Sequence, residues 1–396
     1  MMAPHKPRHI IVVGAGIGGL TAALTLARAG IGVTVIERTE RVSEVGAGIQ
    51  LSPNASRILV NLGLGGQLSE TAVYPDAIRV FSTRSGGEVT TLPLGAHFAA
   101  RYGAPYLVIH RADLQSILLA ACSGNPAIDL KLGIRIAAIH DTGGSIEVET
   151  EAGERFAGDA LVGADGVRSA IRTEVLGGPT ATPSGRIAYR ATIPIEAAPE
   201  AFRSVTCVWM APHAHLVHYP IAGGRLMNLV AVTEDDMPWG TWSEPAERAA
   251  ALAAILGGAS WPHLARDLLD KPDVWTKWAL NAVDPRFDWS KGRITLLGDA
   301  AHAMLPFAAQ GGAMAIEDAE VLAAALSTDL DIAEAFTAYE AARKPRVSAV
   351  VDLAATNGRI YHLANLPAAF RDTALRALPA RFALQRQDWI YAWRAA

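Results

Sequence analysis

A glycine-rich turn between two β-branched runs, within residues 9–40, constrains the fold of this chain most. The order is HIIVV, then GAGIGG, then the apolar segment LTAALTLARAG, and then a second run, IGVTVIE. Short β-branched runs predict buried strands, and the longer apolar segment between them predicts a helix. A strand, a helix and a second strand in this order form a βαβ unit, whose two strands are parallel. We therefore expect an α/β core that begins with this unit.

The glycines of this turn have the spacing Gly-x-Gly-x-x-Gly, and each has its own physical reason. Gly14 permits the tight turn, Gly16 lets the backbone approach a pyrophosphate at the positive helix N-terminus, and Gly19 lets the helix lie close to the strand. Glu37, at the end of the second strand, can accept hydrogen bonds from an adenosine ribose. The predicted dinucleotide site comprises Gly14, Ala15, Gly16, Ile17, Gly18, Gly19 and Glu37. The motif alone does not distinguish FAD from NAD.

A second glycine-rich segment, GDAAHAMLPFAAQGGAMAIEDA at residues 298–319, bears on that choice. The run RITLL before it predicts a buried strand, so Asp299 stands at a strand end, and Gly311 and Gly312 open a helix. Free amides at a helix N-terminus favour negative charge, which a reduced flavin carries around N1 and the C2 carbonyl. We therefore expect FAD, with Asp299 on a ribityl hydroxyl or a phosphate-bridging water. The alternative for Asp299 is an ordinary helix-capping or turn aspartate.

Composition excludes several other classes of protein. A chain of 396 residues exceeds the usual size of one core, so we expect two domains or one domain with a large insertion. A net charge of −4 gives no basic field for nucleic acid, and Cys122 and Cys207 have no metal-ligand or disulfide-framework spacing. We find neither a signal-peptide pattern nor an apolar run of membrane-spanning length. We expect a cytoplasmic protein with no metal site, no nucleic-acid partner and no stable membrane association.

Hydrophobic periodicity predicts the organisation of the remaining chain. Alternating segments between residues 185 and 232 predict an antiparallel sheet. Residues 239–289, which hold six of the nine tryptophans, are expected to be helices that cover this sheet. The last segment is expected to be helical, with a break at residues 345–347. The predicted domains are a discontinuous FAD-binding domain (residues 1–70, 105–178 and 290–345), a substrate-binding sheet domain (71–104 and 179–289) and a C-terminal helical segment (346–396).

Three motifs in one order extend the pattern over the chain: VVGAGIGGLTAALTLARAG with VIER, then GADGVRSAIR, then LLGDAAHAMLPFAAQGGAMAIEDA. Shorter matches include EVGAGIQLSPNASRIL, YGAPYLVIHRADLQ, AYRATIP and HLVHYPIAGGRLMNLVAV. Together they resemble the class A flavoprotein aromatic hydroxylases, FAD-dependent monooxygenases of the p-hydroxybenzoate hydroxylase fold. The most similar branch contains salicylate hydroxylase, 3-hydroxybenzoate 6-hydroxylase and 6-hydroxynicotinate 3-monooxygenase. The resemblance implies a mixed α/β fold with a Rossmann-like FAD-binding domain, an inserted antiparallel substrate sheet and C-terminal helices.

The resemblance also implies a reaction and a set of cofactor contacts. NADH or NADPH binds transiently and reduces FAD, O2 adds to give a flavin C4a-hydroperoxide, and a small phenolic or hydroxy-heteroaromatic acid is hydroxylated. Glu37 and Arg38 would meet the adenosine half of FAD, and Arg111 the ribityl-pyrophosphate region; a surface ion pair is the alternative for Arg111. The implied FAD contacts outside the first turn are Glu37, Arg38, Gly48, Arg111, Ile136, Asp165, Gly166, Asp299, Gly311, Gly312 and Ala313.

Hydroxylation of a phenol needs a base near the ring hydroxyl, because loss of that proton makes the ring more nucleophilic. In HAHLVHYP, residues 213–220, strand alternation places His213, His215, Val217 and Tyr219 on one face. His215 and Tyr219 match the His and Tyr with which related hydroxylases bind and deprotonate the ring hydroxyl. We expect His215 to be the base or a proton relay. The alternative is a histidine without a catalytic role.

Four further residues are expected to contact the substrate: Gln50, Arg190, His302 and Pro306. Gln50 would approach the flavin, Pro306 would border its reactive face, and Arg190 would meet a carboxylate or form a sheet-edge salt bridge. His302 would either line the pocket or hold its loop by a hydrogen bond. The 3-hydroxybenzoate 6-hydroxylases have a Gln in the loop of Pro306, and the 6-hydroxynicotinate enzymes have a His near Gln50. Both differences point away from those two substrates.

Two questions stay open at the level of sequence. A flavin oxidase or dehydrogenase of the same fold, acting without oxygen insertion, is the alternative function. The DG and GDAAH motifs, with the following proline, favour the monooxygenase. The resemblance implies a small-molecule aromatic substrate and a chain that is either a monomer or a homodimer.

Overall fold

The computed structural model describes residues 8–41, 48–235, 243–257 and 259–395. Trp239, Trp242, the first residues of the EVGAGIQ segment and the N-terminus used to judge a signal peptide lie outside the described residues.

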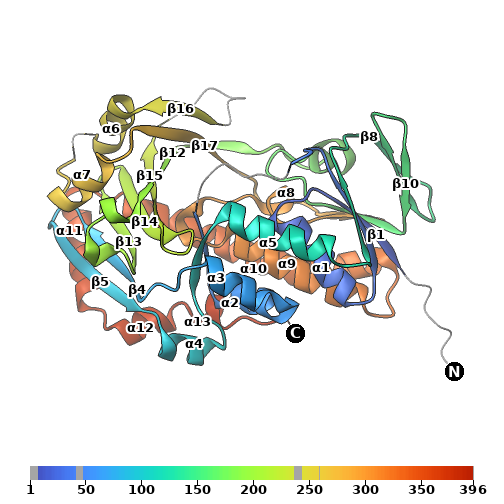
Figure 1. The fold of residues 1–396 in the computed structure, drawn as a ribbon, viewed down its shortest axis with the longest axis horizontal. Coiled ribbons are helices and arrows are strands. Elements are labelled where there is room, and N and C mark those ends of the chain that lie inside the picture. The colour runs from blue at the N-terminus through green and yellow to red at the C-terminus, as the bar shows by residue number, and fades with distance from the viewer. Residues whose placement is uncertain (1–7, 42–47, 236–242, 258, 396) are drawn as a thin grey trace.

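A six-stranded sheet forms the centre of the half of the molecule that begins with β1 (Figure 1). Its strands, in spatial order, are β18 (Ser290–Lys291), β19 (Ile294–Leu296), β11 (Ala160–Gly163), β1 (His9–Val13), β2 (Gly32–Glu37) and β7 (Ile128–Leu132). All of them are parallel except β18. The carboxyl ends of the parallel strands therefore meet at one edge of the sheet.

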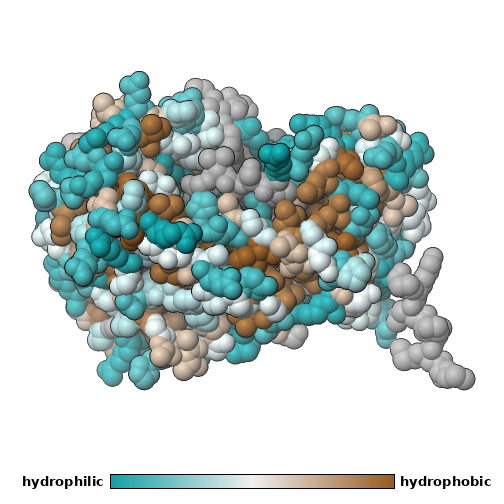
Figure 2. Space-filling model, in the orientation of Figure 1, coloured by the Kyte–Doolittle hydropathy of each residue, from teal (hydrophilic) through white to brown (hydrophobic). Residues whose placement is uncertain are grey.

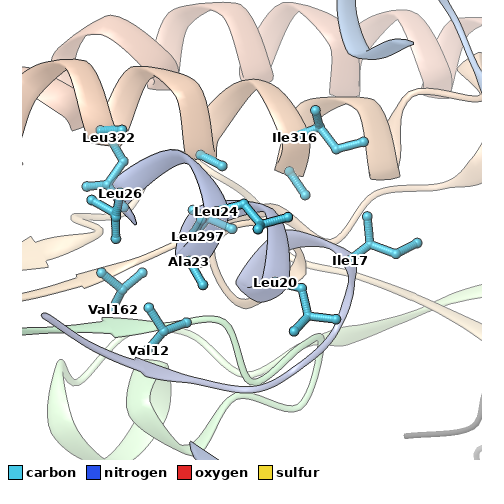
Figure 3. Close-up of a cluster of buried hydrophobic side chains, with 14 of the residues drawn as sticks. Val12, Ile17, Leu20, Ala23, Leu24, Leu26, Val162, Leu297, Ile316 and Leu322 are labelled. Atoms are coloured by element: carbon cyan, nitrogen blue, oxygen red, sulfur yellow. The ribbon is translucent and has the colours of Figure 1, made fainter. Parts of the chain in front are cut away.

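Helix α1 (Ile17–Arg28) lies between this sheet and helix α9 (Gly311–Leu326), as Figure 3 shows. Its apolar residues make two contacts at once: Leu20, Ala23 and Leu26 belong to the same core as Val12 and Val162 of the sheet and Ile316 and Leu322 of α9. The Thr25 hydroxyl also donates to the Ala319 carbonyl at 2.9 Å. The two glycine-rich segments are thus packed against each other, although residues 41–297 separate them in the sequence.

An eight-stranded sheet forms the second half (Figure 1). In spatial order it contains β16 (Ser243–Glu247), β17 (Val274–Ala282), β12 (Thr182–Pro194), β15 (Leu226–Glu234), β14 (Ala214–Ile221), β13 (Thr206–Ala211), β4 (Ala77–Ser82) and β5 (Gly87–Pro93). A two-stranded ribbon consists of β3 (Gly48–Leu51) and β6 (Leu107–His110), which stand in the sequence where the chain passes from one large sheet to the other. A separate three-stranded sheet consists of β8 (Ile136–Asp141), β9 (Ile146–Thr150) and β10 (Arg155–Gly158).

The remaining helices cover these sheets or follow them along the chain. Their bounds are α2 (Pro53–Leu59), α3 (Gly65–Thr71), α4 (Ala96–Tyr102), α5 (Arg111–Ser123), α6 (Arg248–Leu256), α7 (His263–Leu269), α8 (Asp299–His302), α10 (Ile332–Tyr361), α11 (Asn365–Ala377), α12 (Ala380–Gln385) and α13 (Asp388–Tyr391). Short π- or 3-10 turns occupy Val60–Leu64, Ile171–Val175, Ile195–Ala197, Glu200–Phe202 and Pro306–Ala308. None of the helices in the described part of the chain is long and apolar enough to cross a membrane.

The predicted mixed α/β class, the first βαβ unit and the helix over residues 311–326 are confirmed. The predicted sheet is largely antiparallel, but β4 pairs with β13 in parallel and so brings residues 77–82 into it. The expectation of helices throughout residues 239–289 is wrong for β16 and β17. Trp275 is buried inside the sheet, since aromatic residues suit a strand as well as a helix face.

The predicted helix break at residues 345–347 is also wrong, because α10 continues through Pro345. A proline removes one backbone donor from a helix and usually kinks or ends it. Here Arg343 and Arg346, on either side of the proline, are both bound to carboxylates of α9. These contacts hold both sides of the proline against the neighbouring helix.

A buried ionic network joins α9 to α10 and to the loop after β19. Arg343 donates to Glu317 and to Asp318, both at 2.7 Å, and Arg346 donates to both oxygens of Glu317 at 2.7 Å. Asp318 also accepts from the Gly298 amide at 3.0 Å. Two cations thus face two anions, and His302 and Asn54 bind the same carboxylates at 2.6 and 2.7 Å. Burial alone would raise the pKa of Asp318, but His302 and then Arg343 outweigh it and lower this pKa to about 2.

We expect Arg343→Met to destabilise the protein by about 3–5 kcal/mol, because it leaves buried carboxylates without their cation. The matched control is Arg28→Met: Arg28 pairs with Glu320, also on α9, at 2.6 Å, but its side chain is 41% exposed. An exposed pair of this kind contributes about 1 kcal/mol or less. Urea unfolding of the two variants measures the difference, and equal losses of stability would contradict the role given to the buried network.

Candidate active site

The glycines of the first turn fit three different geometric demands. Gly14 has φ +107°, and a Cβ there would lie 2.4 Å from the Ala164 carbonyl oxygen. A Cβ on Gly19 would lie 2.0 Å from the Gly14 carbonyl oxygen, so only glycine lets the helix approach the strand this closely. A Cβ on Gly16, the N-cap of α1, would meet no atom within 4 Å. The backbone at Gly16 therefore borders open space at the positive end of a helix.

The other residues of this turn support it. Ile17 is buried in the core, and a Cβ on Gly18 would lie 2.8 Å from Leu297. The Ala15 amide donates to Glu37 Oε2 at 2.8 Å, while Glu37 Oε1 accepts from the amide and the hydroxyl of Thr39, both at 2.9 Å. Glu37 is thereby fixed beside the turn at the carboxyl end of β2, and Arg38 next to it is exposed.

Two further aspartates follow strands of the same sheet. Asp165 comes after β11; its Oδ2 accepts from the Ile171 amide at 3.2 Å. Its Oδ1 is buried and has no hydrogen-bond partner among the described residues, and burial raises the pKa of this carboxyl. Gly166 has φ +82° with open space where a Cβ would be. Asp299 comes after β19 and is exposed.

The N-terminus of α9 completes this edge. The first turn of α9 holds no acidic residue and no side-chain cap, so the amides of Gly311, Gly312 and Ala313 have no acceptor inside the helix. A Cβ on Gly312 would lie 2.6 Å from Ile49 of β3, which explains a glycine at this position. The α1 turn, Glu37, Asp165, Asp299 and the α9 N-terminus therefore belong to one edge of one parallel sheet. An open phosphate turn, an orphaned buried carboxylate oxygen and an uncapped helix end fit an extended anionic dinucleotide such as FAD.

Three more predicted cofactor residues lie around this edge. Gly48 pairs with His110 in the β3–β6 ribbon, and Arg111 follows as the first residue of α5. Ile136 begins β8 with its side chain partly buried against the core. Just before it, the Ile134 amide donates to the Glu37 carbonyl at 2.9 Å, so this segment runs beside the end of β2.

Hydrophobic residues gather on the visible face where Figure 1 places α1, α5 and α8, while the outer rim is mostly hydrophilic (Figure 2). Within the described part of the chain, no group of three His, Cys, Asp or Glu residues has a metal-binding arrangement. Cys122 and Cys207 are buried free thiols.

A second cluster of polar residues lies where β3 meets the large sheet. Tyr106 donates to Gln50 Oε1 at 2.6 Å, and Gln50 also hydrogen-bonds Tyr219. The Gly48 amide donates to Asn228 at 3.1 Å, and a Cβ on Gly48 would lie 2.4 Å from the Tyr219 ring. Burial raises the pKa of Tyr219, and the nearby Arg190 opposes this. Arg190 also lies over the Trp278 ring at 5.3 Å. The structure thus brings Gln50, Tyr219 and Arg190 together.

His215 and Tyr219 lie on the same face of β14, as predicted, with Val217 between them. His215 is 2% exposed and packs beside the rings of Phe307 and Tyr361, with centroids at 5.2 and 5.4 Å. Its pKa is lowered, first by burial and then by His362 and Arg186. His215 is therefore neutral at pH 7, as a general base must be. His213, expected on the same face, lies instead in the preceding turn with φ +59° and is exposed, because β14 begins only at Ala214.

The two remaining predicted residues lie in the loop between β19 and α9. His302 is fully buried, and its Nε2 lies 2.6 Å from Asp318. This contact favours the second role considered for His302, that of holding its loop. Pro306 is exposed and begins the short turn that carries Phe307 to His215.

Sequence reasoning missed His362, which contacts His215, and Glu234, which contacts His362. Glu234 is the last residue of β15 and lies next to the turn that contains His213. The alternation of the predicted strands places it there but does not indicate a function for it. His362 follows α10 and has no local motif.

Comparison with known proteins agrees with this geometry. Residues 8–354 match the family described as FAD binding domain. The 3-hydroxybenzoate 6-hydroxylase of Klebsiella oxytoca is 36% identical over 394 residues, which cover 98% of each chain. The 6-hydroxynicotinate 3-monooxygenase of Bordetella bronchiseptica is 35% identical over 87% of this chain and 90% of its own.

Solved structures give the same result for the fold. The crystal structure of Klebsiella pneumoniae HpxO complexed with FAD and uric acid has a TM-score of 0.81 and 26% identity, covering 96% of this chain and 95% of its own. A salicylate hydroxylase substrate complex has a TM-score of 0.82 at 24% identity, covering 98% and 96%, and this likeness concerns the fold. This chain belongs to the FAD binding domain family and, within it, to the FAD-dependent aromatic monooxygenases.

Proposed function

We propose that this chain hydroxylates a small phenolic or hydroxy-heteroaromatic acid, using FAD, NADH or NADPH, and O2. The observation that carries the proposal is one neutral, buried histidine, His215, on the sheet face that also holds Tyr219 and Arg190, with Gln50 of β3 against Tyr219. Relatives over nearly the whole chain are named as hydroxylases of such acids. The protein is proposed to act in the cytoplasm, as a monomer or a homodimer.

The edge of the parallel sheet would hold FAD. The amides at the N-termini of α1 and α9 would bind the pyrophosphate and the flavin ring, respectively, and Glu37 would bind the adenosine ribose. The open space at Gly16 and the orphaned Asp165 oxygen support these assignments. Bound FAD supplies the electron transfer from NAD(P)H and the activation of O2.

The second cluster would hold the aromatic substrate. Arg190 offers a cation for the carboxylate, and Tyr219 and Gln50 offer hydrogen bonds to a ring hydroxyl. His215 would take the proton from that hydroxyl, since burial leaves its imidazole neutral and able to accept it. Phe307 and Tyr361 exclude water from this histidine.

The purified protein is expected to be yellow and to consume NADH or NADPH faster with one member of a panel of salicylate, hydroxybenzoates, hydroxynicotinates and simple phenols. Oxygen uptake and product analysis then show a hydroxylated ring. A yellow protein that forms only peroxide with every compound would favour an oxidase of the same fold, and a protein unable to retain FAD would contradict the whole proposal.

Gly19→Ala is expected to reduce FAD retention sharply, because its Cβ would overlap the Gly14 carbonyl oxygen and push α1 away from the turn. The matched control is Gly66→Ala, since a Cβ at Gly66, in helix α3, meets no atom within 4 Å. Flavin absorbance per mole of purified protein measures the effect. Equal flavin content in both variants would contradict the assignment of this turn to FAD.

His215→Gln is expected to lower the rate of hydroxylation by about 10²–10⁴-fold while FAD reduction by NAD(P)H stays close to wild type. The matched control is His218→Gln on the opposite face of β14, where His218 accepts a hydrogen bond from Trp209 at 3.0 Å. Rapid-mixing measurements separate the reductive step from the oxidative step. A slower reductive step alone, with hydroxylation unchanged, would remove His215 from the role of base.

A further inference from the structure

A chain of hydrogen bonds leads from His215 to the surface. Nδ1 of His215 lies 2.9 Å from Nε2 of His362, and Nδ1 of His362 lies 2.9 Å from Oε1 of Glu234. His362 caps the C-terminus of α10 and Glu234 ends β15, so three distant segments supply the chain. His215 is buried, whereas the Glu234 side chain is 39% exposed. The hydrogen bonds therefore connect the protein interior with solvent.

The carboxylate at the outer end fixes the protons along this chain. An ionised carboxylate only accepts hydrogen bonds, so His362 donates from Nδ1 to Glu234. A neutral imidazole has one N–H, so Nε2 of His362 accepts and His215 donates from Nδ1. The lone pair of His215 then lies on Nε2, for which the described residues offer no hydrogen-bond partner. The geometry leaves His215 with a basic nitrogen on the side away from His362.

The protonation states agree with this assignment. Burial opposes ionisation of Glu234, but hydrogen bonds from His362 and His213 outweigh it and lower its pKa to about 2. Burial lowers the pKa of His362, and Glu234 only partly opposes this. At neutral pH the chain therefore consists of two neutral imidazoles and one carboxylate.

We propose that His215, His362 and Glu234 form a proton relay that carries the phenolic proton of the substrate to solvent. The inference rests on the proposed function. The O–H bond of the ring hydroxyl breaks and an N–H bond forms at Nε2 of His215. The Nδ1 proton of His215 passes to Nε2 of His362, and the Nδ1 proton of His362 passes to Glu234, which releases a proton to water. Nothing is oxidised or reduced in this step. Afterwards each of the three residues has its initial charge, but the two imidazoles have exchanged one tautomer for the other. A proton that passes back along the same path restores the original tautomers.

Several groups surround His362 and fix its position. His362 lies at the C-terminus of a long helix, whose partial negative charge stabilises an imidazolium. Its carbonyl accepts from the His213 amide at 3.2 Å, which fixes its position a second time. The other titratable or charged groups around the relay are Arg186, His213, Tyr361 and Arg371. Arg186 reaches Glu234 at 3.4 Å.

The relay is tested with the FAD-loaded protein and the panel phenol that the wild type hydroxylates, starting with salicylate. After a rapid pH jump, the absorbance of the bound phenolate reports ionisation of the ring without any turnover. We expect His362→Gln and Glu234→Gln to slow phenolate formation and hydroxylation by about 10²-fold, with FAD reduction unchanged. In His362→Ala, added imidazole is expected to restore the rate, which a merely structural role would not allow.

His213→Asn serves as the matched control. His213 binds the other oxygen of Glu234 at 2.8 Å outside the relay, and asparagine tolerates its positive φ. This variant is expected to form phenolate at the wild-type rate. Wild-type hydroxylation with unchanged phenolate formation in the His362 and Glu234 variants would overturn the relay alone. A wild type that hydroxylates no panel phenol would overturn the proposed function, and the relay with it.

Discussion

Four charged side chains between α9 and α10 fix the second glycine-rich segment at the end of β19. Arg343 and Arg346 neutralise Glu317 and Asp318, and Asp318 in turn binds the Gly298 amide. A buried charge without its partner costs several kcal/mol, so the position of each helix depends on the other. The uncapped N-terminus of α9 is therefore held rigidly against the edge of the parallel sheet, where its amides face the same region as those of α1.

The short ribbon of β3 and β6 joins this edge to the large sheet. Gly48 contacts Tyr219 and Asn228 of the large sheet, while Ile49 contacts Gly312 at the start of α9. The next residue, Gln50, binds two tyrosines at once. Three consecutive residues thus contact both halves of the molecule. A substrate pocket beside a cofactor edge requires such a joint, because neither sheet alone carries both sets of groups.

Much of the fold could be predicted from the sequence, because glycine spacing and period-2 alternation follow directly from backbone geometry. The first turn, the strand ends at Asp165 and Asp299 and the shared face of His215 and Tyr219 are of this kind. Trp275 was misjudged because tryptophan fits helix faces and strands equally, and Pro345 because distant carboxylates hold its helix together. His362 could not be found, since its contact with His215 depends on how a long helix ends over a sheet. The assignment of individual cofactor and substrate contacts stays a prediction.

The late position of the groups that complete the nucleotide half has a consequence for folding. The core around β1 and α1 is complete only when β19 and α9 have been added, and α9 is fixed only when Arg343 has been added. In contrast, β12 to β15 form antiparallel pairs within a short stretch of chain. Contacts between distant residues form slowly, because the loop between the contacting residues must close first. The inserted sheet can therefore fold while the apolar faces of β1 and α1 are still uncovered. During that interval the nascent chain exposes its most hydrophobic strand, and it is then that aggregation competes with folding.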